Sequence, residues 1–282
     1  MGRIQRGIGF TRQTWSLVRG RPGLVVLPSV ALVLEAAVVA ILLGPLWLNI
    51  LDHHSRWNLF LDGVVCGYPL TFVSTFFNVA YYAQVDAAFR GEPIGARQAV
   101  GQATARLRTI AAWALLTTGV GIALRAIEQL PYAGSLAGRI VTRFLDAAWA
   151  IASVFVVPAL ALENTGVGDS LRRSVTAIRA RWGEAATGSV AIGGAGLLVI
   201  LPVIAAGCVG WFARESHPVA GYGLLTAAAA GAAVVIVVQE TMSEAFRVAV
   251  FRYASGDAPA GPFTESQLAE AFTPRRRRGS FR

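Results

Sequence analysis

The chain has 282 residues, of which 55% are hydrophobic and only 15% charged, and its mean hydropathy is +0.55. Soluble domains carry about 25% charged residues, so this composition excludes an ordinary soluble protein and indicates a membrane protein. The formal charge of +9 does not point to nucleic acid, because the basic residues flank apolar runs without an interleaved aromatic surface. We expect anionic phospholipid as their partner.

Six apolar segments are long enough to cross a bilayer as helices, which takes about 20 residues. The first follows a long basic stretch and exceeds a signal-peptide core, so we expect it to remain in the mature protein. The predicted spans are residues 24–50, 59–88, 109–126, 144–163, 185–213 and 219–250. Residues 1–256 should form one membrane domain. A cytoplasmic tail, 257–282, should follow, with a short helix and a polybasic end.

The arginines predict the orientation of these spans, because positive charge is retained on the cytoplasmic side. Lysine is absent, which favours a bacterial source. Most arginines fall in the N-terminal segment, the second and fourth connections and the C-terminal side. The exceptions are Arg56, Arg125, Arg139, Arg143 and Arg214. We therefore predict a multi-pass protein of the bacterial plasma membrane with both termini in the cytoplasm.

Three basic segments have the apolar spacing of amphipathic helices, and each precedes a pair of spans. The clearest has a stripe of Leu171, Val175, Ile178 and Trp182, with Asp169 as the predicted N-cap. Such helices should lie flat at the interface, with the stripe in the acyl region and the arginines at the headgroups. The fold class is thus an all-α, six-helix membrane bundle built from three repeats of interfacial helix plus transmembrane hairpin. The predicted headgroup-binding residues are Arg3, Arg6, Arg12, Arg97, Arg106, Arg172, Arg173, Arg179 and Arg181.

Acidic residues near the inner ends of the even-numbered spans should be balanced by these arginines, since a lone carboxylate near hydrocarbon is costly. The expected structural ion pairs involve Asp86, Glu163, Glu240 and Glu244. A pair between Glu244 and Arg247 on the same helix is a simpler alternative for the last of them.

Polar residues inside the spans are the other candidates for a site. Glu35 lies well inside the first span, where it either has a function or is balanced by a neighbouring helix or water. Asn78 and Gln84 can supply interhelical hydrogen bonds. Four prolines fall inside spans and should kink them: Pro28, Pro69, Pro158 and Pro202. We expect no metal or cofactor, because His53, His54 and their neighbours lack strong ligand spacing. Cys66 and Cys208 are interpreted as free thiols, although both map toward the outer side.

Several stretches together resemble an uncharacterised prokaryotic family of multi-pass membrane proteins, domain of unknown function 6159. They begin at Gly2 (GRIQRGIG), Trp15 (WSLV), Phe76 (FFNVA), Phe155 (FVVPALALE), Ser170 (SLRRS), Trp182 (WGE) and Phe246 (FRVAVFRYA). The chain is more distantly similar to the membrane domain attached to some glycerophosphodiester phosphodiesterases. The first resemblance implies a six-span bacterial membrane protein. Neither supplies an active site, because no hydrolase domain is recognised here.

No nucleophile-and-base arrangement or phosphate-binding loop is recognised, so we expect no enzyme activity and no catalytic residues. The favoured hypothesis is a non-enzymatic scaffold, accessory subunit or lipid-handling module that grips anionic lipid on its cytoplasmic face. The alternative is a small transporter or channel whose polar path includes Glu35 and Glu240. Other membrane proteins and a second copy of this chain remain candidate partners.

Overall fold

The computed structural model describes residues 15–16, 18–52, 56–128, 135–181 and 186–256, and every regular element in these ranges is a helix. The chain divides into two compact units. The central unit is Val26–Arg179, and the terminal unit combines Met1–Val25 with Ala180–Arg282.

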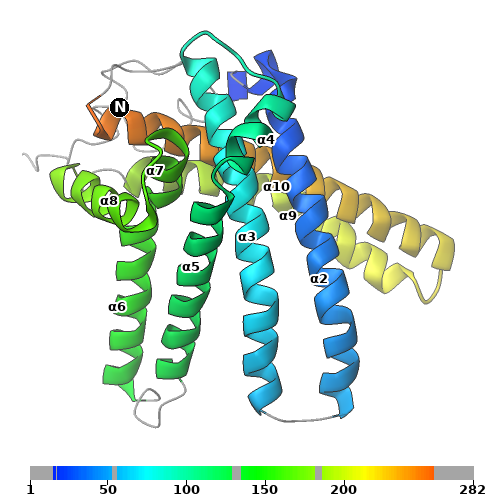
Figure 1. Cartoon of the computed structure of the whole chain (residues 1–282). Coiled ribbons are helices and arrows are strands. Elements are labelled where there is room, and N and C mark those ends of the chain that lie inside the picture. Colours follow the sequence, from blue (N-terminus) through cyan, green and yellow to red (C-terminus); the bar gives the residue numbers. More distant parts are fainter. Residues whose placement is uncertain (1–14, 17, 53–55, 129–134, 182–185, 257–282) are drawn as a thin grey trace, which may run out of the picture. The chain divides into compact units, whose positions relative to one another are not determined.

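Four long helices of the central unit stand side by side in a row (Figure 1). Along this row α2 (Val26–Asp52) packs on α3 (Arg56–Phe89), α3 packs on α5 (Leu107–Glu128), and α5 packs on α6 (Leu136–Ser153). In this arrangement α2 and α6 are the two edge helices of the unit. Trp113 of α5 stacks on Trp149 of α6 with ring centroids 5.9 Å apart, which fixes the level at which these two helices meet.

Three short helices cover one end of this row. They are α4 (Ala96–Thr104), α7 (Val156–Leu162) and α8 (Val167–Arg181). Both α4 and α7 pack on α3, whose residues 79–88 are all buried. Val167 and Leu171 of α8 pack against a cluster of Trp113, Val156 and Leu160. The best-packed region of the unit is therefore at this end of the helices.

The terminal unit contains a helical hairpin of α9 (Ala186–Ala213) and α10 (Pro218–Ala254), together with η1 (Pro22–Val25), which contacts α10. The hairpin requires a glycine just after its turn. A Cβ on Gly221 would lie 2.5 Å from the backbone N and Cα of Arg214, closer than real side chains approach. The first turn of α10 can pack on the end of α9 only because this position has no side chain.

Helices occur at all six predicted spans, but the fourth span, 144–163, was predicted as one helix and is two, α6 and α7. Four described segments are long and apolar enough to cross a membrane. They are Pro22–Leu42, Leu107–Glu128, Gly138–Leu162 and Pro218–Ala254. The protein is thus all-helical with membrane-spanning segments, and the six-helix bundle remains a prediction.

Two of the three predicted interfacial helices are present as α4 and α8. The first, around Ile4 to Trp15, and the tail 257–282 lie outside the described residues, apart from Trp15 itself. The threefold repeat therefore stays a prediction. The predicted N-cap is wrong, because α8 begins at Val167 and Asp169 lies inside its first turn. A carboxylate there still interacts favourably with the helix dipole.

Replacing Gly221 with Ala should destabilise the α9–α10 hairpin, because the new methyl group would overlap the Arg214 backbone. Gly223→Ala is the matched control two residues along the same helix, where a Cβ meets no atom within 4 Å. Removing that glycine should raise stability by about 0.5 kcal/mol, because Ala favours a helix. Thermal unfolding in detergent should give a lower Tm for Gly221→Ala only. Equal Tm values for the two variants would contradict the close approach.

Candidate functional site

Polar side chains gather where α4, α7 and α8 meet the ends of α3 and α5. We call this set the polar belt. Its members are Gln84, Asp86, Arg90, Arg106, Glu163, Thr165, Ser170, Arg173 and Ser174. The belt lies at one end of helices that are long and apolar enough to cross a membrane.

The belt is organised around a helix break just before Pro158. Proline has no N–H for the carbonyl of Val154, and its ring crowds that carbonyl, which favours a break here. Accordingly α6 ends at Ser153 and α7 begins at Val156. The buried backbone N–H of Phe155 donates instead to Oγ of Ser174 in α8, at 3.1 Å. A side chain nineteen residues later in the chain thus accepts the hydrogen bond that the broken helix does not provide. Pro69 and Pro202, by contrast, lie inside the continuous helices α3 and α9, so the predicted kinks did not become breaks there.

Arg106, in the link between α4 and α5, holds the opposite end of α7. Its guanidinium donates from Nη1 to the backbone carbonyls of Leu160 and Ala161. These carbonyls belong to the last turn of α7, where no further helical N–H is available and a cation is favoured by the helix dipole. Burial lowers the pKa of the Arg106 guanidinium. The ordinary pKa of arginine is so high that the group stays charged at neutral pH.

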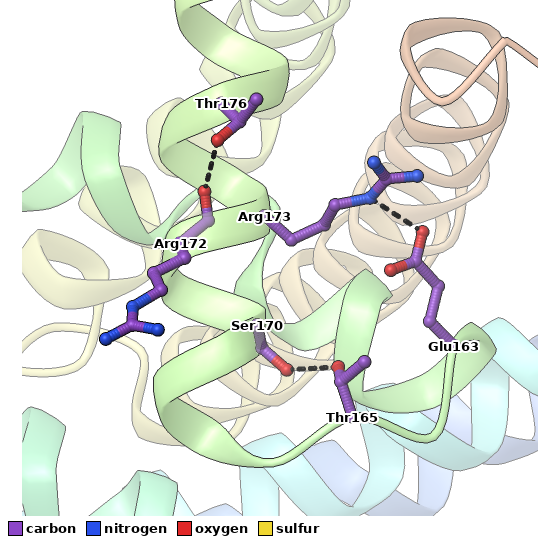
Figure 2. A network of polar contacts seen from close by, with 6 residues as sticks. All are labelled: Glu163, Thr165, Ser170, Arg172, Arg173 and Thr176. Atoms are coloured by element: carbon purple, nitrogen blue, oxygen red, sulfur yellow. Dashed lines mark hydrogen bonds and ion pairs between the residues drawn. The ribbon is translucent and has the colours of Figure 1, made fainter.

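A tight turn joins α7 to α8 and carries an ion pair (Figure 2). Asn164 adopts a left-handed conformation, with φ of 53°, which asparagine tolerates better than most residues. The chain reverses there, and Nε of Arg173 lies 3.0 Å from Oε1 of Glu163. The hydroxyls of Thr165 and Ser170 lie 2.6 Å apart across the same turn. The predicted pairing of Glu163 with an arginine of the following helix is therefore present.

The α3–α4 connection is fixed by two side chains from the end of α3. Nε2 of Gln84 donates to the carbonyl of Ile94 at 3.3 Å. The Asp86 carboxylate pairs with Arg90, one turn later in the sequence, at 2.5 Å. The ion pair of Asp86 thus forms with its own segment, and Gln84 holds a loop instead of a neighbouring membrane helix.

The inward faces of α4 and α8 are built from small residues. Ala99 and Ala103 in α4, and Ser170 and Ser174 in α8, have 0% exposure. The stripe predicted for the acyl region is wrong in part, because Ile178 is buried and Leu171 packs on the Trp113 cluster. Small side chains allow two helices to approach closely, so they occupy this interface in place of larger apolar residues.

The outward faces of these helices carry exposed arginines. Arg97 on α4 is exposed, and so are Arg172 and Arg173 on α8. In Figure 2 the side chain of Arg172 points away from the Glu163–Arg173 pair. Arg106 belongs to the belt interior, so the structure gives it a different role from the one predicted. Arg3, Arg6 and Arg12 and the side chains of Arg179 and Arg181 lie outside the described residues.

The remaining intramembrane candidates lie in both units. In the central unit Glu35 and Asn78 are partly buried, on α2 and α3. In the terminal unit Glu240 is exposed on α10, and Glu244 is buried and pairs with Arg247 at 2.7 Å. The same-helix pair, weighed as the simpler alternative for Glu244, is therefore present. A polar path that includes Glu35 and Glu240 stays a prediction.

Sequence reasoning missed two kinds of polar residue. Ser174 was overlooked because serine carries no hydropathy signal, although its partner follows from the helix break at Pro158. Asp146 was overlooked because the fourth span was drawn to begin at residue 144, near the predicted outer surface. The helix extends back to Leu136, so Asp146 lies well inside it.

Metal-binding groups and thiols were the remaining candidates for chemistry among the described residues. Among them, no three His, Cys, Asp or Glu side chains lie close enough to hold a metal ion. Cys208 is an exposed free thiol, and the side chain of Cys66 lies outside the described part.

The long helices are apolar, the short helices α4, α7 and α8 cover one end of them, and α4 and α8 carry exposed arginines. Together these features are those of a helical integral membrane protein. The chain belongs to a family of unknown function, DUF6159, whose family model matches residues 59–261. It matches no curated protein and no solved structure. The likeness to the membrane domain attached to some glycerophosphodiester phosphodiesterases stays a prediction.

Ser174→Ala should destabilise the protein by about 1–3 kcal/mol, because it leaves the buried Phe155 N–H without its hydroxyl acceptor. Thr176→Ala is the matched control on the same helix. Its exposed hydroxyl bonds only to the carbonyl of Arg172 within α8, so its loss should change stability by less than about 0.5 kcal/mol. Equilibrium unfolding in detergent should separate the two variants. A Ser174→Ala variant as stable as Thr176→Ala would contradict the role of Ser174.

Proposed function

We propose that this protein is a non-enzymatic membrane scaffold, accessory subunit or lipid-handling module that binds anionic phospholipid on the cytoplasmic face of the bacterial plasma membrane. The observation that supports the proposal most directly is that α4 and α8 each have one buried face and one exposed face. Each packs its small residues inward at one end of the central unit and leaves arginine outward.

The polar belt supports the proposal because it fixes the direction in which these arginines point. Ser174 ties α8 to the break before α7, and Arg106 ties the α4–α5 link to the end of α7. Both short helices are therefore connected through α7. Their outward arginines, Arg97 and Arg172, are therefore already positioned at the end of the membrane spans, and no local refolding is needed to expose them. Arginine suits this role, because its planar guanidinium matches phosphate geometry.

The charge distribution supports the cytoplasmic side. The second connection carries Arg90, Arg97, Arg106 and Arg108, whereas Arg125 stands at the opposite end of α5. Positive charge in short loops is retained in the cytoplasm, where the leaflet also contains most of the anionic lipid. The same arginines thus support both the proposed orientation of the protein in the membrane and the proposed anionic lipid ligand.

The proposal predicts that Arg97→Gln combined with Arg172→Gln weakens binding of anionic phospholipid. Each arginine near a charged surface contributes about 1 kcal/mol, so the double variant should lose roughly 30-fold in affinity. Native mass spectrometry of the full chain with phosphatidylglycerol measures this loss. Binding to the unchanged protein should also weaken as salt rises.

Arg125→Gln is the control, because it removes an exposed arginine from the other end of α5. It should bind anionic lipid like the unchanged protein. Equal losses in the control and the double variant, or equal affinity for phosphatidylcholine and phosphatidylglycerol, would refute a specific basic face.

A further inference from the structure

The edge helix α6 carries charged side chains on a face that no other helix of the central unit covers. Arg139, Arg143 and Asp146 recur at intervals of four and three residues, so they lie on one side of the helix. All three are exposed. Ile140, Val141 and Phe144 are also exposed but lie on other sides of the helix, where apolar side chains suit lipid. The helix therefore has a lipid-compatible surface and a separate charged face.

The Trp113–Trp149 stack gives the depth of these charges. Because α5 and α6 run in opposite directions, Asp146 and Arg143 are level with Leu116 and Gly119 of α5. These two residues are at the middle of the span Leu107–Glu128. Both charges also fall inside the span Gly138–Leu162. Both charges thus lie within a helical segment that is long and apolar enough to cross a membrane.

An exposed charge at this depth needs a partner, because hydrocarbon solvates neither a guanidinium nor a carboxylate. Among the residues that the structure describes, Arg143 and Asp146 form no ion pair or hydrogen bond with another side chain. Within the span this face carries one charge of each sign, Arg143 and Asp146. A surface that neutralises both must therefore place an acid against Arg143 and a base against Asp146.

We propose that this face of α6 is a homodimer interface, covered by α6 of a second copy of this chain. Copies inserted in the same orientation are related by a twofold axis along the membrane normal, which makes the two α6 helices parallel. Arg143 of each copy then faces Asp146 of the other. The two residues differ in height by about 4.5 Å, which a flexible arginine side chain spans. Two reciprocal ion pairs neutralise all four charges.

The twofold relation also predicts which small residue lies at the centre of the interface. Ala150 follows Asp146 by four residues and Arg143 by seven, so it is on the charged face. Ala148 is an exposed alanine on nearly the opposite side of the same helix. The two positions are a matched pair for cross-linking, since either accepts cysteine with little change in volume.

The test uses the full chain with Cys66→Ser and Cys208→Ser, reconstituted in liposomes at low protein density. Ala150→Cys should form a disulfide-linked dimer on oxidation, and Ala148→Cys should yield at least tenfold less. Equal cross-linking of both positions, or none at either, would overturn the proposal.

Charge exchange distinguishes ion pairing from mere proximity. Arg143→Asp and Asp146→Arg alone each place like charges opposite one another, so the Ala150→Cys cross-link should fall at least tenfold. The double variant restores opposite charges and should recover the yield to within about twofold. Single-molecule photobleaching should count two copies per complex. A monomeric count, together with spin-label contacts between this face and phospholipid headgroups, would overturn the dimer in favour of a lipid site. These outcomes are independent of lipid binding by α4 and α8.

Discussion

The packed end of the central unit depends on one constraint, which is the helix break between α6 and α7, just before Pro158. The break places a buried N–H at Phe155 and a set of carbonyls at the end of α7, and both ends are satisfied by side chains from other elements. A buried polar group without a partner would cost about 1–3 kcal/mol, so these contacts are a condition for keeping α7 in place. The positions of α4, α7 and α8 are consequences of satisfying this short helix.

The buried contacts of the polar belt contribute more to the free energy of folding than its exposed contacts do. The Glu163–Arg173 pair is partly exposed, and such pairs contribute about 0.2–1 kcal/mol. A hydrogen bond from a charged group to a buried carbonyl contributes about 1.5–3 kcal/mol. Arg106 and Ser174 therefore hold the belt together, whereas the exposed arginines contribute little to its stability. One residue type thus has a structural role inside the belt and, under the proposed function, a lipid-binding role on its surface.

The sequence predicted the helices well, because hydropathy and span length depend only on residues close together in the chain. It also predicted the arginine partner of Glu163. It predicted kinks at Pro158, Pro69 and Pro202 alike, whereas the chain breaks near Pro158 and continues as one helix at the other two. It did not predict which face of α8 is buried, because Ser170 and Ser174 pack by close approach, which a hydropathy pattern does not measure. It assigned Arg106 to lipid, because the carbonyls that this side chain binds are 54 and 55 residues away in the chain. Asp146 was missed for a related reason. Its position along the span depends on the level at which α6 packs on α5, which is again a contact between residues far apart in the chain.

The most direct test of this account is the backbone hydrogen exchange of α7 in an Arg106→Met variant, which keeps the apolar stem of the side chain and removes the charged guanidinium. We expect residues 155–163 to exchange roughly 10- to 100-fold faster than in the unchanged protein, with the centre of α5 unaffected. Arg108→Met, which removes an exposed arginine two positions away, should leave α7 protected. Unchanged exchange of α7 in Arg106→Met, or the same increase in both variants, would contradict the claim that this helix is held from both ends.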